Sequence, residues 1–302
     1  MKDVIYVEHQ NFVSVRGQSL KFVNVVDSSE RYIPIDEIEF LVFDHAKSYF
    51  SNSVIDTCIR ENVGMIFCDQ KHSPISVLTS DFGNRKRLKR IKLQLEMTQK
   101  VKNRIWRKII ICKINNQSAC LRIIANNNQE ADFLKLCAKQ VDEGDRGNKE
   151  AYAARRYFYN LFGSGFKRGR FDDPINAGLN YGYALIRSLI RKELAAHGFE
   201  MSIGIHHESS ENPFNLSDDI IEAYRPFVDA HVYEFIFQKD IFSLGSEEKK
   251  KILQIFFEKC VIDGKVCSIV DAIKITTTSL VTCLEGKSAS HLKLPNFVEV
   301  GK

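Results

Sequence analysis

The spacing of apolar residues changes once along this chain, near residue 85, and that change constrains the fold more than any other feature. Before it, short runs rich in β-branched and aromatic residues predict strands, at residues 4–7, 12–15, 20–25, 38–43 and 65–68. One helix is expected near residues 53–60, where apolar residues recur at helical spacing after serines that can cap a helix. The first part of the chain is therefore predicted to be a small β-rich domain.

Turn-forming residues mark the place of the change. Residues 80–85 include Asp81, Gly83 and Asn84, which favour a loop. Beyond them the apolar spacing predicts helices, at residues 88–113, 132–141, 148–162, 174–197, 218–224, 247–259 and 267–284. Strands followed by helices favour an α+β chain over alternating β-α units. We therefore expect an α+β two-domain protein, with a β-rich domain at residues 1–85 and a larger all-α domain at residues 86–302.

Composition and missing motifs exclude several classes of protein. A chain of 302 residues that is 44% hydrophobic can bury a substantial core. It has no apolar run long enough to cross a bilayer and no secretory signal, so a cytoplasmic protein is expected. The eight cysteines include no Cys-x-x-Cys pair, which favours buried, reduced thiols over a zinc site. The phosphate-binding glycine motifs of nucleotide enzymes are also missing.

Two basic segments are candidates for contact with nucleic acid, although the net charge of +5 is shared by many unrelated enzymes. Residues 85–92 form a dense basic run, and residues 100–108 carry five more lysines and arginines along what is predicted to be the same helix. Residues 166–171 interleave basic and aromatic side chains. Both segments could neutralise phosphates, but a solvated helix face or an ordinary basic loop explains them equally well.

Four polar residues on three separate segments could carry chemistry. Glu150 falls in the first turn of a predicted helix with Asn148 as its cap, where the helix dipole alone explains an acidic residue. His207 lies in a polar turn, where histidine is most often a hydrogen-bonded surface residue but can also bind a metal or move a proton. Asp219 and Glu222 are three residues apart, and therefore on one face, of a helix that Ser217 could cap.

If these segments converge, they offer carboxylate oxygens and an imidazole nitrogen. Such ligands suit Mg²⁺ or Mn²⁺. An ion of this kind polarises a phosphoryl group and lowers the pKa of an attacking water or hydroxyl group, so the pattern fits phosphodiester chemistry. The residues alone leave open a noncatalytic DNA-binding protein in which Glu150 and Glu222 merely favour helix N-termini.

A series of motifs links these residues to a known family. In chain order they are Gly147-Asn148-Lys149-Glu150-Ala151 with Tyr157-Phe158, Asp173-Pro174 with Leu179-Asn180-Tyr181-Gly182-Tyr183, Gly204-Ile205-His206-His207, and Asp219-Ile220-Ile221-Glu222 with Tyr224-Arg225-Pro226-Phe227-Val228-Asp229. Together they resemble CRISPR-associated protein one, the spacer-acquisition integrase and endonuclease, in the form found in type II systems. The resemblance covers essentially the whole chain.

The resemblance implies a β-sandwich-like N-terminal domain that mediates dimerisation, followed by a helical catalytic domain. It implies that Glu150, His207 and Glu222 are the catalytic residues and bind Mg²⁺ or Mn²⁺, with Asp219 at a further acidic position near them. The Gly-x-x-His frame selects His207, although a shifted turn would present His206 instead.

The activity implied by the resemblance is DNA integration. A homodimer would join CRISPR-associated protein two in a heterohexamer, bind double-stranded prespacer DNA, and insert its 3′ ends into the CRISPR repeat by transesterification. Cooperation with the type II effector nuclease is also implied. Two alternatives remain open, namely a stand-alone metal-dependent nuclease of branched or single-stranded DNA and a noncatalytic DNA-binding scaffold.

Overall fold

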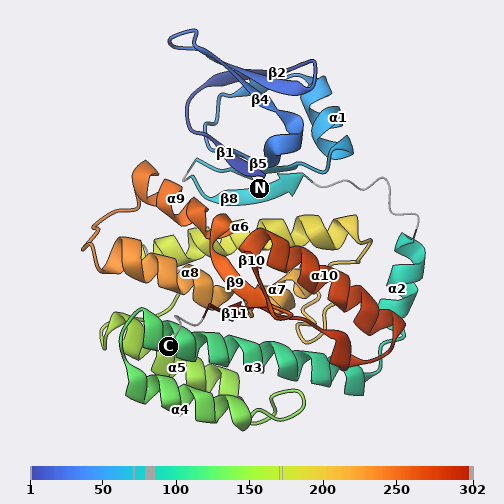
Figure 1. Cartoon of the computed structure of the whole chain (residues 1–302), viewed down its shortest axis with the longest axis vertical. Coiled ribbons are helices and arrows are strands. Elements are labelled where there is room, and N and C mark those ends of the chain that lie inside the picture. Colours follow the sequence, from blue (N-terminus) through green and yellow to red (C-terminus); the bar gives the residue numbers. More distant parts are fainter. Residues whose placement is uncertain (1, 71, 79–85, 170, 172, 299–302) are drawn as a thin grey trace. The chain divides into compact units, whose positions relative to one another are not determined.

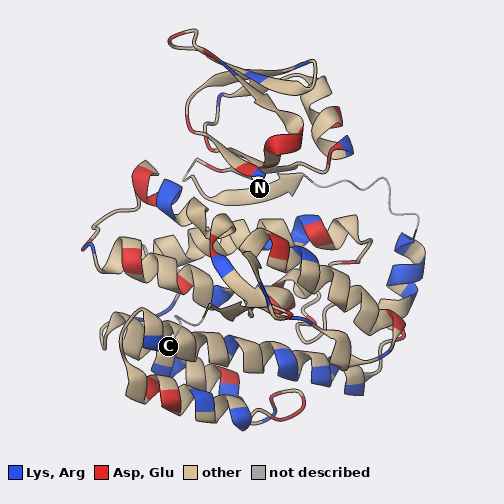
Figure 2. Cartoon of the chain, in the orientation of Figure 1, with Lys and Arg blue, Asp and Glu red and all other residues tan. Residues whose placement is uncertain are grey.

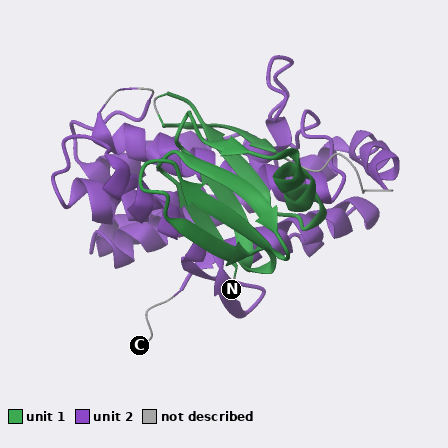
Figure 3. Cartoon of the chain, turned by 90° about the horizontal axis from the view of Figure 1, so that it is seen from above, with its two compact units in different colours: residues 1–84 green, residues 85–302 purple. Residues whose placement is uncertain are grey.

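The computed structural model describes residues 2–70, 72–78, 86–169, 171 and 173–298 of the chain. It divides into two compact units, residues 1–84 and 85–302 (Figure 3). The first is rich in strands and the second in helices, which confirms the predicted mixed composition and its order along the chain (Figure 1). Within the described residues, no helix is both long and apolar enough to cross a membrane.

The first unit contains two four-stranded sheets. One has the order β1 (Asp3–Val7), β5 (Ile38–Phe43), β7 (Gly64–Cys68) and β8 (Pro74–Leu78). The first three strands are parallel and β8 is antiparallel to β7. All six residues of β5 are buried, as is usual for an inner parallel strand covered on both faces.

The second sheet has the order β4 (Glu30–Pro34), β3 (Ser19–Asn24), β2 (Asn11–Arg16) and β6 (Tyr49–Phe50). Both sheets and the helix α1 (Asn52–Arg60) contribute apolar side chains to one core, which includes Val13, Leu41 and Val54. The five strands expected from the sequence are present. Strands β4, β6 and β8 were not predicted, because they bury few side chains: β4 buries only Ile33, and no residue of β6 or β8 is fully buried.

The second unit is built mainly from helices. They are α2 (Arg87–Leu95), α3 (Gln99–Ile123), α4 (Asn128–Lys139), α5 (Lys149–Phe162), α6 (Pro174–Ala196), α7 (Asn215–Ile221), α8 (Arg225–Val232), α9 (Ser246–Leu253) and α10 (Ile269–Glu285). The long helix α3 packs along α4, α5 and α8, whereas α6 contacts α7, α8, α9 and α10.

Two local predictions for these helices are wrong. Residues 88–113 are not one helix, because the backbone of Thr98 is extended and its hydroxyl accepts a hydrogen bond from Val101 N, which begins α3 as a separate helix. Ser217 does not cap α7. It lies inside that helix and donates a hydrogen bond to the carbonyl oxygen of Phe214.

The expectation of an all-α second domain is also wrong. A three-stranded antiparallel sheet, with the order β10 (Lys265–Ser268), β9 (Lys259–Ile262) and β11 (Asn296–Phe297), lies within this unit. The two-residue turn between β9 and β10 is Asp263-Gly264, and both residues have positive φ angles. Asp-Gly is the sequence favoured in such hairpins. The residue ranges predicted as helices, 247–259 and 267–284, therefore each include residues that belong to a strand of this sheet.

Candidate functional site

Glu150 lies in the first turn of α5, and the carboxylate of Asp145 holds that turn. Asp145 accepts hydrogen bonds from the backbone amides of Lys149 at 2.9 Å and Glu150 at 3.0 Å. Asn148, the predicted cap, instead has a left-handed backbone and makes no capping hydrogen bond through its side chain. The position of Glu150 therefore depends on an acidic residue outside the helix.

Lys113, on α3, joins two of the predicted site residues. Its Nζ atom lies 2.6 Å from Glu150 Oε1 and 2.5 Å from Glu222 Oε2. The other carboxylate oxygen of Glu222 accepts a hydrogen bond from Arg225 Nε at 2.7 Å. The side chains of Lys113 and Glu222 are only 8% and 7% exposed, whereas that of Glu150 is 28% exposed. Two carboxylates from separate segments thus converge on one cation.

The charges in this cluster hold one another in their ionised forms. Burial alone would raise the pKa of Glu222, but Arg225 and Lys113 outweigh it and lower that pKa to about 2. Burial alone would lower the pKa of Lys113, but the carboxylates of Glu222 and Glu150 raise it. Buried charges are expensive unless they are paired, and both of these groups are paired.

His207 is held by the second acidic residue of α7. The carboxylate of Asp219, whose side chain is fully buried, accepts hydrogen bonds from the backbone amides of Ile205, His206 and His207 at 2.6, 3.1 and 3.1 Å. Asp219 Oδ1 also lies 2.8 Å from His207 Nδ1. This hydrogen bond, more than any other effect, raises the pKa of His207, and the charge of Glu222 contributes to the same shift.

Gly204 allows this turn to form so close to α7. A Cβ atom at this position would lie 2.2 Å from the carbonyl oxygen of His207 and 3.0 Å from Asp219 Oδ2. Only glycine avoids the clash with the backbone. The Gly-x-x-His spacing therefore has a steric reason, and it places the imidazole of His207 rather than that of His206 against Asp219.

The two adjacent histidines have different surroundings. The imidazole of His206 is stacked on the indole ring of Trp106, with ring centroids 4.2 Å apart and an angle of 2° between the planes. The His207 ring meets Trp106 edge-on, with the centroids 5.7 Å apart. With Nδ1 of His207 directed at Asp219, Nε2 is the nitrogen left to bind a metal.

The helices behind Glu222 form a second polar cluster. The guanidinium group of Arg225 lies 4.4 Å from the centre of the Tyr183 ring, and that of Arg168 lies 5.2 Å from it. The hydroxyl group of Tyr183 donates a hydrogen bond to Asp229. Burial raises the pKa of Asp229 to about 6, although the hydrogen bond from Tyr183 opposes that shift. Arg225 is therefore held between Glu222 and an aromatic face.

The donor set suits a hard or borderline divalent cation, because Glu150 and Glu222 already share one positive charge and His207 lies within electrostatic reach of Glu222. In the side-chain arrangement of the described residues, however, no three histidine, cysteine or acidic groups lie close enough together to hold a metal ion. The ammonium group of Lys113 occupies the point where the two carboxylates meet.

The predicted basic segments are largely engaged within the chain. Figure 2 shows lysines and arginines along α2 and α3. Lys102 pairs with Glu208 at 3.6 Å and Arg104 with Glu143 at 2.8 Å, while Lys108 donates to the carbonyl oxygen of Ala289 at 2.9 Å. Arg85, at the start of the first segment, lies outside the described residues.

The second basic segment is also used in packing. Phe166 packs against Phe162, with ring centroids 4.8 Å apart. Arg168 donates hydrogen bonds to the side chains of Asn176 and Asn180. Arg170 is outside the described residues.

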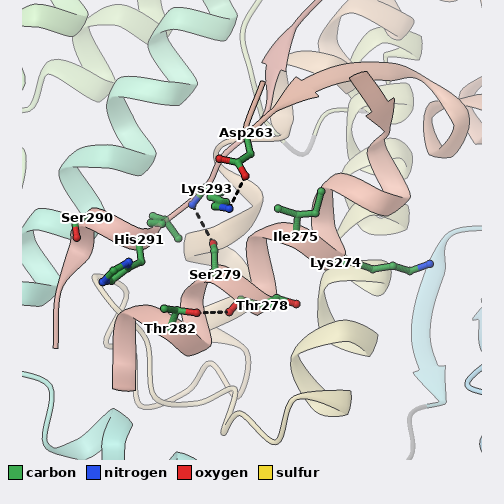
Figure 4. A pocket seen from close by; sticks show the side chains of 10 residues that line it. Asp263, Lys274, Ile275, Thr278, Ser279, Thr282, Ser290, His291 and Lys293 are labelled. Carbon is green, nitrogen blue, oxygen red and sulfur yellow. Dashed lines mark hydrogen bonds and ion pairs between the residues drawn. The ribbon is translucent and has the colours of Figure 1, made fainter. Parts of the chain in front are cut away.

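A pocket of about 650 Å³ lies elsewhere in the second unit, along α10 (Figure 4). Its charged and hydroxyl groups are partly paired with one another. Lys293 Nζ lies 2.5 Å from Asp263 Oδ2, and Lys293 N donates to Ser279 Oγ at 3.0 Å. None of the predicted site residues lines this pocket.

The sequence analysis missed three residues that position the site. Lys113 stands within the apolar run 109–114, and a lone lysine in such a run signals a buried charge that needs acidic partners. Arg225 follows Glu222 by three residues, a spacing that brings the two side chains to one helical face. Asp145 has no comparable signal, because its role depends on a turn with an unusual backbone.

Comparisons with known proteins point to one family. A family model described as "CRISPR associated protein Cas1" matches residues 5–254. The chain is 30% identical over 269 residues to the CRISPR-associated endonuclease Cas1 of Neisseria meningitidis serogroup C (strain 8013), covering 88% of this chain and 87% of that protein. It is 24% identical over 233 residues to a Cas1 endonuclease of Pyrobaculum aerophilum, covering 72% of this chain and 78% of that protein.

Solved structures share the fold. A casposase bound to an integration product matches with a TM-score of 0.77 at 18% identity, covering 95% of this chain and 92% of the casposase. A Cas1 protein from Thermotoga maritima matches with a TM-score of 0.74 at 17% identity, covering 94% and 97% of the two chains. The predicted resemblance is thereby confirmed, and the chain belongs to the CRISPR-associated protein Cas1 family.

Proposed function

We propose that this chain is a CRISPR adaptation integrase that joins the 3′ ends of prespacer DNA to a CRISPR repeat by metal-dependent transesterification, with an associated DNA endonuclease activity. The observation that carries the proposal is the convergence of Glu150 and Glu222 on a single cation, the ammonium group of Lys113. Membership in the Cas1 family supports the same assignment.

Glu150, Glu222 and His207 are the residues proposed to hold Mg²⁺ or Mn²⁺, the histidine through Nε2. A bound ion of this kind polarises the phosphoryl group and favours the ionised form of the attacking hydroxyl group or water. The carboxylate of Glu222 is available for this role at neutral pH, because its low pKa keeps it ionised.

The chain's own residues prepare the site in three ways. Asp219 orients the His207 ring and favours a proton on Nδ1, which leaves the lone pair of Nε2 directed away from Asp219. Arg225 orients the carboxylate of Glu222 through Oε1. Lys113 holds the carboxylates of Glu150 and Glu222 together when no ion is bound.

The proposed assembly is a homodimer that joins Cas2 in a heterohexamer and binds double-stranded DNA. A solved Cas6-RT-Cas1–Cas2 complex and a solved Cas1–DNA complex contain relatives with this fold. For dimerisation we propose the β-rich domain at residues 1–85, where Phe12, Tyr32 and Tyr49 are each about half exposed on the second sheet. Cooperation with a type II effector nuclease remains a prediction from the motifs.

Two other functions make different predictions. A stand-alone nuclease would use the same residues with water as the nucleophile, and would cut DNA without joining it. A noncatalytic DNA-binding scaffold would need Glu150 and Glu222 only to neutralise Lys113 and Arg225. Replacing Glu150 would then leave the function intact.

A joining assay separates these functions. The full chain and its cognate Cas2 are mixed with a labelled short duplex and a supercoiled plasmid carrying leader and repeat, in Mg²⁺ or Mn²⁺. Joined product should form with the wild type and disappear with Glu150→Gln, His207→Ala or a chelator. Glu143→Gln, which alters an exposed ion pair with Arg104, is the matched control and should retain joining. Cutting without joining would favour the nuclease. Joining by Glu150→Gln would contradict the proposed catalytic role of Glu150.

A further inference from the structure

His206, the neighbour of His207, presents an aromatic ring to solvent on a rigid support. Trp106, the one tryptophan of the chain, is only 2% exposed. The imidazole of His206 lies parallel to its indole ring at a centroid distance of 4.2 Å, although His206 itself is an exposed residue. The imidazole therefore covers a buried aromatic ring on one side and meets the His207 ring edge-on, with the centroids 5.8 Å apart, while the residue as a whole is exposed.

The backbone of His206 is fixed as well. Its amide donates to Asp219 Oδ2 at 3.1 Å, between the hydrogen bonds that Ile205 and His207 make to the same carboxylate. An exposed side chain normally loses rotamer freedom when it binds a ligand, at a cost to affinity. Because the stack and the hydrogen bonds already restrain His206, this cost is small.

The position of this ring limits what it can bind. It is adjacent in sequence to His207, and both imidazoles contact the same indole ring. A DNA phosphate bound through a metal ion at Glu150, His207 and Glu222 would carry nucleobases within a few bond lengths of its own oxygens. Flat nucleobases stack on aromatic and imidazole side chains, whereas nothing else in bound DNA offers a flat apolar face.

We propose that His206 is a stacking platform for a nucleobase that flanks the phosphate bound at the site, and that Trp106 is a positioning residue for this platform. The proposal rests on the proposed function and adds a specific contact to it. His206 and His207 then have separate tasks, the first toward a base and the second toward the phosphate.

The test pairs substitutions at His206 with abasic DNA. Binding of a labelled prespacer duplex is measured by fluorescence anisotropy for the wild type, His206→Ala and His206→Phe, in the full chain. An abasic analogue is placed in turn at each nucleotide near the 3′ end. His206→Ala should weaken binding of intact DNA about tenfold, within the range found for base–aromatic stacking. His206→Phe should bind within about twofold of the wild type, because it keeps an aromatic ring.

Combining His206→Ala with abasic DNA tests whether the imidazole and one particular base contact each other. At one position the abasic analogue should weaken wild-type binding by a similar factor, and His206→Ala should cause no further loss there. The proposal is overturned if His206→Ala binds intact DNA as the wild type does, or if its loss is the same at every abasic position, since the ring would then act only within the protein.

Two readouts separate this proposal from the proposed function. Binding is measured without any joining step, so a wild type that binds but fails to join DNA contradicts the integrase assignment and leaves the stacking test intact. The emission of Trp106 gives an independent check, because the chain has no other tryptophan. DNA should change that emission in the wild type, and abasic DNA at the identified position should change it less; equal changes with both DNAs would contradict stacking at His206.

Discussion

The ammonium group of Lys113 lies 2.5 Å from a carboxylate oxygen of Glu222, and both side chains are almost completely buried. Glu150 reaches the same ammonium group from a different helix. The three residues form a chain of alternating charge that Arg225 extends on the far side of Glu222. In the proposed metal site, Lys113 competes with the metal ion for the same oxygens.

Replacing Lys113 should make the protein depend on metal for its stability. Lys113→Met leaves two acidic side chains close together and one of them buried, which costs about 3 kcal/mol or more. Without metal we expect Tm to fall by roughly 10 °C. Mn²⁺ should then raise the Tm of Lys113→Met much more than that of the wild type, because the ion can replace the missing charge. Differential scanning calorimetry with Mn²⁺ and with a chelator measures both effects.

The control for this experiment is Lys102→Met. Lys102 pairs with Glu208, which is 66% exposed, at 3.6 Å, and such surface pairs contribute little to stability. Its Tm and its response to Mn²⁺ should match those of the wild type. An equal rise in Tm for Lys113→Met and the wild type would mean that the ion does not bind at these carboxylates.

Replacing Asp219 should weaken metal binding without removing a ligand. The carboxylate accepts hydrogen bonds from three backbone amides and faces His207 Nδ1. Asp219→Asn turns one acceptor oxygen into a donor and frees the His207 ring to rotate. Changes of this kind behind a ligand typically reduce metal affinity about 10- to 100-fold. Isothermal titration with Mn²⁺ measures the loss. Glu208→Gln should bind as the wild type does, and unchanged affinity in Asp219→Asn would contradict the proposed role of His207.

The pH dependence of stability should include a contribution from Asp229. Its pKa is raised from 3.8 to about 6, mainly by burial. A raised pKa in the folded state favours the protonated form. The associated stability is therefore present below about pH 4 and is lost as the pH rises through 6. Asp229→Asn keeps an acceptor for Tyr183 and carries no charge. It should gain stability over the wild type by roughly 1.4 kcal/mol between pH 5 and pH 8, because the rest of the loss in the wild type falls below pH 5.

Urea unfolding of both proteins at the two pH values measures this gain. Asp132→Asn, which removes a carboxylate that is 68% exposed, is the control and should show no such difference. A gap between Asp229→Asn and the wild type that does not change with pH would show that Asp229 is ionised throughout this range.

The cysteines should differ widely in reactivity. All eight are free thiols, and six of them are buried while Cys68 and Cys267 are partly exposed. Burial raises the pKa of Cys58 and of Cys112 to about 12, so almost no thiolate is present at neutral pH. Brief iodoacetamide treatment of the native protein, followed by mass spectrometry, should label Cys68 and Cys267 first. Denatured protein should label at all eight positions. Early labelling of Cys58 would indicate that the first unit opens readily.

Much of the fold follows from local sequence patterns. The change from strand to helix spacing near residue 85 and the order of the predicted helices depend on residues close together in the chain, and the structure contains nearly all of them. The hairpin at Asp263-Gly264 also had a local signal. It was overlooked because the flanking apolar residues fit a helix as well as a strand.

The sequence by itself determined which segments could carry chemistry and, through the order of their motifs, which family the chain belongs to. Only the tertiary structure decided how those segments meet. The contact of Lys113 with Glu150 and Glu222, the capping of α5 by Asp145, and the different surroundings of His206 and His207 all join residues from separate segments or depend on one unusual turn. Such contacts form only when the whole unit buries its apolar surface, and no local pattern specifies them.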